Sequence, residues 1–311
     1  MTRTLCAIGN FDGVHRGHRA VLARAAADAR DAGLEPVLLT FDPHPAVVLG
    51  RQPPAVLTPL SRKIELVRRV DPSLRVVVRR FDKAFSQLEP EEFVRDVLVN
   101  ELRVARVVVG RNFRFGKARK GDLARLAELG AEHGFVAQAT ELYGDERGPW
   151  SSTRAREAIA RGDLEEAELV LGRPHALTGR VVPGDRRGRQ LGFPTANLVD
   201  VEEARPPHGV YAVLVDRVAE DGSAKALARG VANLGVRPTF ETTPALEVHL
   251  LDFDGDLYGA TLRMHLVARL REEKRFASLA ELQAQIAHDI ERAREVLASR
   301  TPDEAAQGAW Y

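Results

Sequence analysis

The hydrophobic pattern of the chain changes at residue 172, and this change constrains the fold more than any other feature. Before it, short apolar runs of the kind found in buried strands alternate with amphipathic helical stretches. The expected strands cover residues 5–8, 36–41, 74–78, 106–109 and 136–139, and the expected helices cover residues 15–32, 59–70, 90–101 and 122–133. This alternation is typical of a parallel sheet with helices on both faces, which binds ligands beyond the carboxyl ends of its strands.

The second half of the chain has the pattern of an antiparallel domain. A helical stretch over residues 153–171 ends at Gly172-Arg173-Pro174. Turns rather than helices separate the strands expected next, at residues 176–182, 211–216, 227–232, 246–251 and 262–270. An antiparallel sheet or small barrel follows from this pattern, closed by a helix over residues 278–298. We therefore expect an α/β domain over residues 1–172, a barrel domain over residues 173–300 and a polar tail over residues 301–311.

Composition places the chain among globular proteins and argues against a charge-driven partner. Apolar residues make up 44%, and 45 Lys and Arg against 44 Asp and Glu leave a formal charge of +1. No global field draws the chain to nucleic acid or to a membrane, so we expect neither partner. The lone Cys6 lies in an apolar run and is expected to be a buried small residue. No apolar run approaches ~18 residues and no signal peptide is evident, which predicts a cytoplasmic protein.

A glycine-rich segment with two histidines stands between the first expected strand and helix, at residues 9–18 (Gly-Asn-Phe-Asp-Gly-Val-His-Arg-Gly-His). Its glycines allow the backbone to approach a bulky ligand, and the helix that follows offers free N–H groups to a phosphate. His15 and His18 share one face of the first helical turn, where their imidazoles can donate hydrogen bonds to phosphate oxygens. A surface histidine at position 15 and a metal-binding pair are the alternatives.

This segment resembles the HxGH signature of the nucleotidyltransferases, present here as His15-Arg16-Gly17-His18. Three further segments match in order: residues 40–45 (Thr-Phe-Asp-Pro-His-Pro), residues 107–116 (Val-Val-Val-Gly-Arg-Asn-Phe-Arg-Phe-Gly) and residues 151–156 (Ser-Ser-Thr-Arg-Ala-Arg). Together they resemble the N-terminal half of the bacterial bifunctional riboflavin kinase/FMN adenylyltransferases, also called FAD synthetases. The resemblance implies a Rossmann-like nucleotidyltransferase domain that adenylylates FMN to FAD and releases pyrophosphate from ATP.

The same resemblance assigns roles to particular residues. His15 and His18 are expected in catalysis. Nucleotide binding is expected of Gly9, Phe11, Asp12, Gly17, Ser152, Thr153 and Arg156, and flavin binding of Asp42 and Asn112. Asp42 could instead be a solvent-facing carboxylate, residues 152–156 an ordinary helix cap with solvated arginines, and Phe113 and Phe115 either stack on a ring or pack the loop. The chain departs from the family pattern at Arg111 and Ala155.

The C-terminal half carries a second ordered set of segments and no strand–helix phosphate loop. These segments are residues 188–197 (Gly-Arg-Gln-Leu-Gly-Phe-Pro-Thr-Ala-Asn), 207–211, 233–239 and 247–254. They resemble the riboflavin kinase domain, whose family fold is a small antiparallel barrel. The resemblance implies Thr195 and Asn197 as ligands of Mg²⁺ and of the ATP phosphates, and Glu247 as general base. It also implies a nucleotide flap that contains Gly184 and Gly188, and flavin contacts from Arg271 and Phe276.

By position alone, each of these residues has an ordinary structural explanation. Glu247 could be solvated on the polar face of a strand, residues 195–197 could be a plain turn, and Arg186, Arg187 and Arg189 a solvated charge run. Taken together, the two halves predict an enzyme that phosphorylates riboflavin to FMN and adenylylates FMN to FAD, with ATP and Mg²⁺ serving both steps. The alternatives are a single-activity enzyme with one half inactive and a non-catalytic flavin-binding module. The sequence leaves the oligomeric state open.

Overall fold

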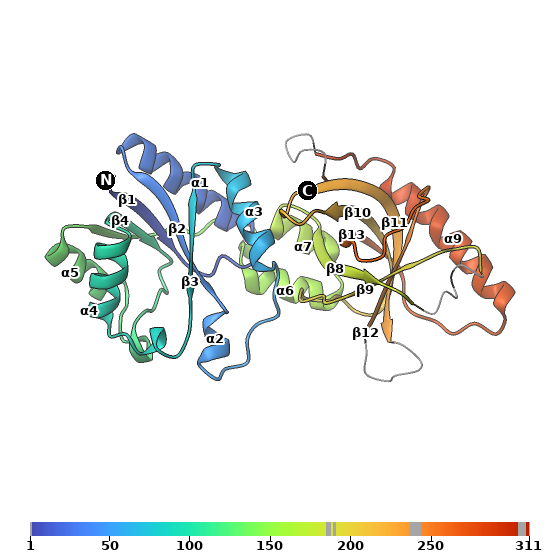
Figure 1. The fold of residues 1–311 in the computed structure, drawn as a ribbon, viewed down its shortest axis with the longest axis horizontal. Helices are drawn as coiled ribbons and strands as arrows, with labels where there is room; N and C mark the ends of the chain where they lie inside the picture. The colour runs from blue at the N-terminus through green and yellow to red at the C-terminus, as the bar shows by residue number, and fades with distance from the viewer. Residues whose placement is uncertain (1, 185–187, 189–190, 237–243, 304–308, 311) are drawn as a thin grey trace. The chain divides into compact units, whose positions relative to one another are not determined.

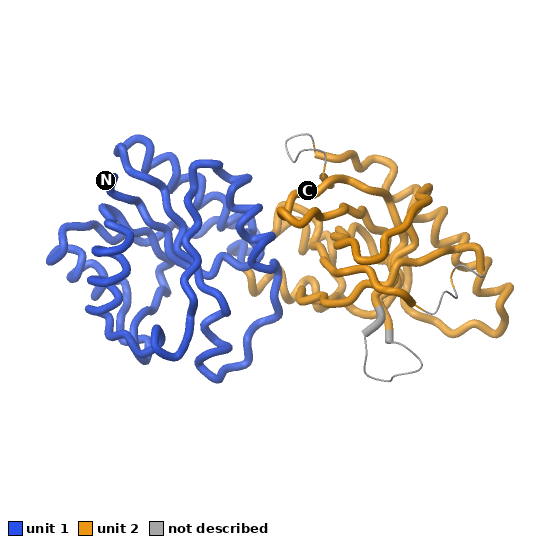
Figure 2. Tube along the Cα trace, viewed as in Figure 1, with its two compact units in different colours: residues 1–151 blue, residues 152–311 orange. Residues whose placement is uncertain are grey.

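The computed structural model describes residues 2–184, 188, 191–236, 244–303 and 309–310. They form two compact units, residues 1–151 and 152–311 (Figure 2). The helices α6 (Ser152–Arg161) and α7 (Leu164–Leu171) belong to the second unit. The sequence placed a boundary between two functional domains at residue 172, and this boundary stays a prediction.

The first unit is built on a five-stranded parallel sheet with the order β3-β2-β1-β4-β5 (Figure 1). Its strands are β1 (Thr4–Ile8), β2 (Glu35–Asp42), β3 (Arg75–Arg80), β4 (Val104–Val109) and β5 (Val136–Ala139). All five strands expected from the sequence are present, and the parallel pairing confirms the α/β prediction. β1 lies in the middle, and each of its five residues is buried.

Helices cover both faces of this sheet because successive strand residues point to opposite sides. Cys6 and Ile8 of β1 pack with Phe93 and Val97 on one face, whereas Leu5 packs with Ala29 of α1 (Arg16–Asp31) on the other. Burial raises the pKa of the Cys6 thiol to about 12, so this cysteine is the buried small residue that the sequence predicted.

The remaining helices of the first unit follow the expected ranges, with one change of geometry. They are α2 (Pro45–Val48), α3 (Leu60–Val70), α4 (Pro90–Glu92), the π-helix η2 (Phe93–Glu101), α5 (Leu123–His133) and the 3₁₀ turns η1 (Phe85–Gln87) and η3 (Lys117–Arg119). One α-helix was expected over residues 90–101, but the structure has a short α turn that continues as π-helix. A two-stranded hairpin, β6 (Gly144–Asp145) and β7 (Gly148–Pro149), precedes the second unit.

The second unit is a closed barrel of six antiparallel strands with the order β10-β11-β12-β9-β8-β13 (Figure 1). The strands are β8 (His175–Val182), β9 (Ala196–Val199), β10 (Gly209–Val218), β11 (Ala224–Val236), β12 (Pro244–Leu250) and β13 (Thr261–Arg271). The barrel and its terminal helix α9 (Leu279–Leu297) confirm the predicted fold class. β9 is a barrel strand that the pattern did not predict.

Alternate residues of the barrel strands fill the interior, and α9 packs on the outside. Tyr211 and Val213 of β10 belong to the interior cluster, whereas Val210 and Ala212 face Ala293 and other residues of α9. Among the apolar residues of α9, Leu279 and Val296 are exposed. The residues of α9 that are buried are Asp289, Ala293 and Leu297. Leu282, Ile286 and Ile290 line a cavity.

The described part of the C-terminal tail packs on the barrel. Asp303 and Ala309 form an antiparallel bridge, Ala309 is buried, and the Arg229 guanidinium lies 5.5 Å from the centre of the Trp310 ring. The Trp310 backbone N–H donates to Asp216, whose other carboxylate oxygen lies 2.8 Å from His265 Nε2. Burial acts to raise the pKa of Asp216, but these partners outweigh it and the pKa lies below its ordinary value.

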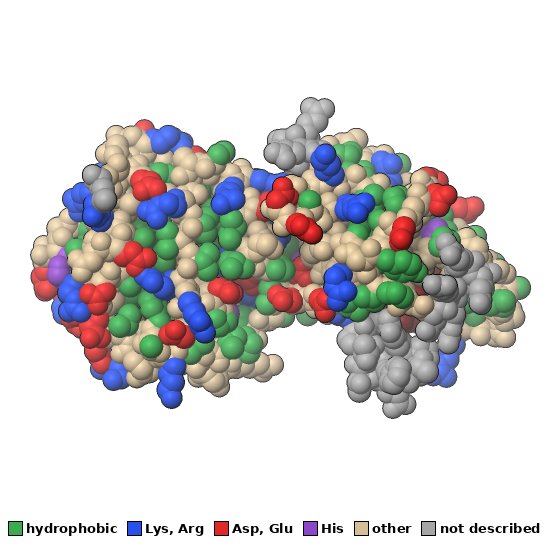
Figure 3. Space-filling model, in the orientation of Figure 1, with side chains coloured by type: hydrophobic (Ala, Val, Ile, Leu, Met, Phe, Trp, Pro, Cys, Tyr) green, Lys and Arg blue, Asp and Glu red, His purple; other side chains and the backbone are tan. Residues whose placement is uncertain are grey.

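Two features of the whole chain bear on its partners. On the face shown in Figure 3, acidic and basic side chains of the first unit are interspersed rather than separated by sign. Within the described residues, no helix is both long and apolar enough to cross a membrane.

Candidate active sites

The glycine-rich loop between β1 and α1 brings His15 and His18 together. His15 is the N-cap of α1, and its Nδ1 accepts a hydrogen bond from the His18 backbone N–H at 3.2 Å. The two rings stack with centres 3.6 Å apart, and Phe11 lies 4.7 Å from His18. Because Nδ1 of His15 is an acceptor, the neutral ring carries its proton on Nε2, where it can be donated to a ligand. The first turn of α1 contains no acidic residue, which keeps this helix end favourable for a phosphate.

Close packing explains why two of the glycines in this loop are needed. A Cβ on Gly17 would lie 3.1 Å from the Trp150 carbonyl oxygen and 3.2 Å from the His15 ring. A Cβ on Gly9 would lie 3.0 Å from the Phe11 ring. The glycines therefore allow the rings of Phe11 and His15 to lie against the backbone, which fixes the positions of the imidazoles.

Asp12 anchors the loop to the segment before α3. Its carboxylate accepts hydrogen bonds from the backbone N–H groups of Leu57 and Thr58 at 3.0–3.1 Å and from the Thr58 hydroxyl at 3.3 Å. The Thr58 hydroxyl in turn accepts from the Gly13 backbone N–H at 3.0 Å. Asp12, expected from the sequence as a nucleotide ligand, therefore has structural partners in this arrangement.

A buried lysine lies near the same loop. Lys63 of α3 is buried, and burial lowers the pKa of its ammonium while Asp12 and Asp42 act to raise it. Asp42 itself is exposed at the end of β2. A cation at this position partly balances the two carboxylates, and the motif matches from the sequence gave no reason to select it.

A cavity of about 360 Å³ opens at the carboxyl ends of β1, β2 and β4. This is the edge of the sheet at which a doubly wound fold binds ligands. Gly9 and Asn112 line it, as do Phe113 and Phe115, whose rings stack with centres 5.6 Å apart. The other aromatic lining residues are Phe41, Phe81, Phe85 and Phe93, and the basic ones are His44, Arg51, Arg114 and Arg119.

The cavity suits a flat aromatic ring that carries an anionic group, because phenylalanine faces and cationic side chains share its wall. Phe115 also belongs to the buried core, and Phe113 packs against that core, so the two rings pack the loop and line the cavity at once. His15, His18 and Asp42 do not line this cavity. Phe81 and Phe85 were missed at the level of the sequence because they lie outside the matched motifs.

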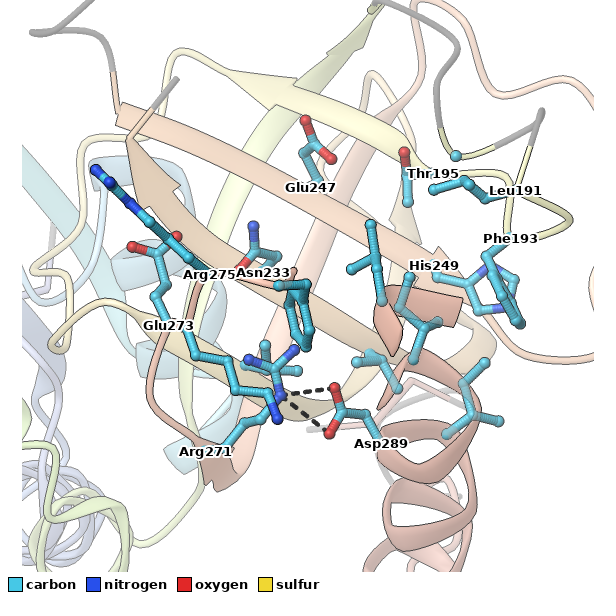
Figure 4. A pocket seen from close by; sticks show the side chains of 18 residues that line it. Leu191, Phe193, Thr195, Asn233, Glu247, His249, Arg271, Glu273, Arg275 and Asp289 are labelled. Carbon is cyan, nitrogen blue, oxygen red and sulfur yellow. Dashed lines mark hydrogen bonds and ion pairs between the residues drawn. The ribbon is translucent and has the colours of Figure 1, made fainter. Parts of the chain in front are cut away.

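The second unit has a larger cavity, of about 830 Å³, between the outer face of the barrel and α9 (Figure 4). It collects Thr195, Glu247, Arg271 and Phe276, all selected from the sequence, together with Gly188. Asn197 is adjacent, since it pairs with Glu247 across β9 and β12. Residues that the sequence did not select also line it: Phe193, Asn233, His249, Glu273, Lys274 and the apolar residues Leu282, Ile286 and Ile290 of α9.

The predicted flap glycines that the structure describes lie against the two predicted phosphate ligands. A Cβ on Gly188 would lie 3.1 Å from Thr195 Oγ1, and a Cβ on Gly184 would clash with the Asn197 amide. Residues 185–187, which include Arg186 and Arg187, and Arg189 lie outside the described residues.

These side chains fit the magnesium ion that the resemblance implies. Thr195 and Asn197 offer neutral oxygen atoms, and Mg²⁺ commonly keeps several waters and binds substrate phosphates beside a few protein oxygens. Among the described residues, no three His, Cys, Asp or Glu side chains gather as a protein-made metal cage.

Charged groups hold the opposite wall of this cavity together. The Arg271 Nε lies 2.9 Å and 3.2 Å from the two carboxylate oxygens of the buried Asp289 (Figure 4). Gln285 donates to Asp289 at 2.9 Å and accepts from Lys274 Nζ at 2.7 Å. Two cations lie near the Phe276 ring, with Lys274 Nζ 4.9 Å and the Arg271 guanidinium 5.6 Å from its centre. Residues 271–276 are thereby tied to α9.

Ser152, Thr153 and Arg156 occupy the first turns of α6 in the second unit. Arg154 of α6 forms an ion pair of 2.6 Å with Glu166 of α7. The expected role of these three residues in binding the triphosphate stays a prediction from the sequence.

Both units match enzyme families of flavin metabolism. A family model for FAD synthetase matches residues 1–154, and one for riboflavin kinase matches residues 171–297. The fold and these two matches thus define a class of flavin enzymes with two modules.

Full-length relatives share both modules. The chain is 43% identical over 297 residues to the bifunctional riboflavin kinase/FMN adenylyltransferase of Escherichia coli, covering 95% of this chain and 93% of that protein. It is 36% identical over 299 residues to the Bacillus subtilis protein of the same name, covering 94% and 92%. The chain belongs to the bifunctional riboflavin kinase/FMN adenylyltransferase family, which confirms the resemblance found in the sequence.

A solved structure is similar over both units. It is the crystal structure of a protein from Streptococcus pneumoniae that is named macrolide-efflux protein. It superposes on the chain with a TM-score of 0.80 at 29% identity, and the match covers 94% of each chain.

Proposed function

We propose that this chain performs two successive reactions of flavin cofactor synthesis. The barrel unit transfers the γ-phosphoryl group of ATP to riboflavin and forms FMN. The first unit transfers the adenylyl group of a second ATP to FMN and forms FAD and pyrophosphate. The observation that supports this most strongly is the presence of two differently built cavities in two compact units, each lined by residues that its family motif selected.

In the kinase reaction, Glu247 acts as general base on the 5′-hydroxyl of riboflavin. The deprotonated oxygen attacks the γ-phosphorus, the bond between that phosphorus and the β,γ-bridging oxygen breaks, and ADP leaves. Thr195 and Asn197 hold the phosphates in line with the attacking oxygen, which is the main requirement of phosphoryl transfer. Bound Mg²⁺ would neutralise phosphate charge beside Thr195 and Asn197. Arg271 and Phe276 bind the flavin.

In the adenylyl transfer, a phosphate oxygen of FMN attacks the α-phosphorus of ATP and the bond to the pyrophosphate oxygen breaks. The reacting partners are both anions, so the protein must supply positive charge and hydrogen-bond donors where charge develops. His15, His18 and the N-terminus of α1 supply them next to Gly9, Phe11 and Gly17. Ser152, Thr153 and Arg156 are proposed to bind the triphosphate. Asn112 and Asp42 serve the flavin, whose ring lies on Phe113 and Phe115.

The substrates are therefore the small molecules riboflavin, FMN and ATP. A cytoplasmic location, expected from the sequence, is proposed with this function.

Substitutions separate the two sites. His18→Ala should lower FAD formation from FMN by about 10²- to 10⁴-fold while riboflavin phosphorylation is retained. Glu247→Gln should do the reverse by a similar factor, because the amide cannot accept the hydroxyl proton. Rates of FMN and FAD formation, measured separately by chromatography on each purified variant, test this. If either substitution removes both activities from a protein that still unfolds cooperatively, the proposal of separate sites is wrong.

A further inference from the structure

Three polar residues form a row across adjacent strands on the outer face of the barrel. In the strand register, Asn233 of β11 lies opposite Glu247 of β12, and Glu247 lies opposite Asn197 of β9. Their chain neighbours Leu234, Leu246, Val248 and Leu198 all point into the barrel. The three polar side chains therefore share the outer face, with Cβ atoms of directly opposed residues about 5 Å apart. Glu247 is the middle member of the row.

The two ends of this row face different parts of the cavity. On the β9 side stand Asn197 and Thr195, with the glycines of the predicted nucleotide flap against them. On the β11 side, Asn233 lies between Glu247 and Arg271 in the view of Figure 4. In-line phosphoryl transfer requires the nucleotide and the attacking hydroxyl on opposite sides of the transferred phosphorus. Since the nucleotide residues lie on the β9 side of Glu247, the flavin approaches from the β11 side.

The side chain of Asn233 presents an amide group on the β11 side of the cavity. It lines the cavity and is half-buried, and within the described part of the chain its side chain makes no hydrogen bond. The cavity wall next to it on the same face is apolar at Val231 and Val210. An asparagine amide has two donors and an acceptor, which suits a hydroxyl group that both donates and accepts.

We propose that Asn233 binds a secondary hydroxyl of the ribityl chain of riboflavin, at the 3′ or 4′ carbon, and so selects flavins that carry this chain. The proposal rests on the proposed kinase function. The 5′-hydroxyl must reach Glu247, while the apolar end of the flavin ring fits against Leu282, Ile286 and Ile290 of α9. The ribityl chain spans the interval between them, past Asn233. An amide there places the 5′-hydroxyl at the base without taking part in the proton transfer, so Asn233 is a positioning residue for the reaction.

The test is the phosphorylation of riboflavin, 3′-deoxyriboflavin and 4′-deoxyriboflavin by the full-length protein. Asn233→Ala should lower kcat/KM for riboflavin by about three- to tenfold, mostly through KM, because one hydrogen bond to substrate is lost. With the deoxy flavin that lacks the partner hydroxyl, the same substitution should cause no further loss. This loss of sensitivity for one analogue identifies the hydroxyl.

A second variant gives a readout that a purely structural role would not produce. Asn233→Leu keeps the approximate size but removes the amide, so it should lower kcat/KM for riboflavin and cause no further loss for the deoxy flavin that lacks the partner hydroxyl. Val231→Ala is the matched control: it shortens an apolar side chain on the same strand and face, and should affect riboflavin and both deoxy flavins by the same factor.

Two results overturn the proposal. One is an Asn233→Ala variant that keeps the wild-type kcat/KM for riboflavin, and the other is an equal loss for riboflavin and both deoxy flavins. Adenylylation of FMN by the same preparations shows that each variant is folded. A wild-type protein that forms no FMN from riboflavin would instead contradict the kinase function itself, which distinguishes the two failures.

Discussion

Asp12 lies in the middle of the glycine-rich loop, yet its carboxylate is turned toward residues 57 and 58. Three donors, the backbone N–H groups of Leu57 and Thr58 and the Thr58 hydroxyl, surround it. These hydrogen bonds connect the loop that carries His15 and His18 to the segment leading into α3. These contacts give Asp12 a structural role in holding the loop of the two histidines, and its expected contact with the nucleotide stays a prediction.

Asp12→Ala should lower the free energy of unfolding of the first unit by about 1–3 kcal/mol, because three donors lose a charged acceptor. Urea denaturation followed by a spectroscopic probe measures this. FAD formation should fall with the stability, while riboflavin phosphorylation in the second unit is retained. Unchanged stability together with a raised KM for ATP in FAD formation would contradict this role and support direct binding of the nucleotide.

Among the elements, the chain between β8 and β9 brings Gly184 and Gly188 close to residues that the sequence selected. Gly184 and Gly188 pack on Asn197 and Thr195, so backbone lies where side chains would otherwise stand. This close approach leaves the hydroxyl and amide groups confined beside Glu247. Any atom added at Gly184 must displace the Asn197 amide.

Gly184→Ala should therefore lower kcat/KM for ATP in the kinase reaction by about tenfold or more, since a displaced ligand misaligns the phosphates. The adenylylation of FMN by the same variant is the internal control and should stay at the wild-type rate. Steady-state kinetics of both reactions measure the effect. A Gly184→Ala protein with normal riboflavin phosphorylation would show that Asn197 need not keep this position.

Most elements could be predicted because their patterns are local. Period-2 alternation and continuous apolar runs predicted the strands of the parallel sheet and the barrel strands other than β9 within a few residues of their observed ends. The four-residue strand β9 was missed because it is too short to show a period and its place is set by pairing with β8 and β12. The π-helix over residues 93–101 was missed because it differs from an α-helix in its backbone hydrogen bonds. The spacing of apolar residues in the sequence does not reveal that difference.

Only those residues of the candidate sites that lie in recognisable motifs could be predicted from the sequence. The sequence selected Thr195, Glu247 and Arg271, and the structure brings these to one cavity. It did not select Asn233 or His249, because cross-strand register decides which side chains share a face. Leu282, Ile286 and Ile290 of α9 line the cavity, and the buried Asp289 is the partner of Arg271. Apolar periodicity identifies a helix face without saying whether protein or ligand covers it.

For the molecule as a whole, each of the two compact units has one of the described cavities, and the product of one reaction is the substrate of the other. The formal charge of only +1 means that attraction of the anionic substrates must come from local groups such as Arg51, Arg114 and Arg119 in the first unit. The single-activity alternative requires that one set of residues be inactive, although both sets are present at their motif positions. Both activities should therefore be measurable in one preparation.

The most direct test of this account is a time course of the purified full-length protein with riboflavin, ATP and Mg²⁺, followed by chromatography of the flavins. The account predicts that FMN appears first and is then converted to FAD, with ADP and pyrophosphate both released. Accumulation of FMN without FAD, or no conversion of riboflavin at all, would contradict it.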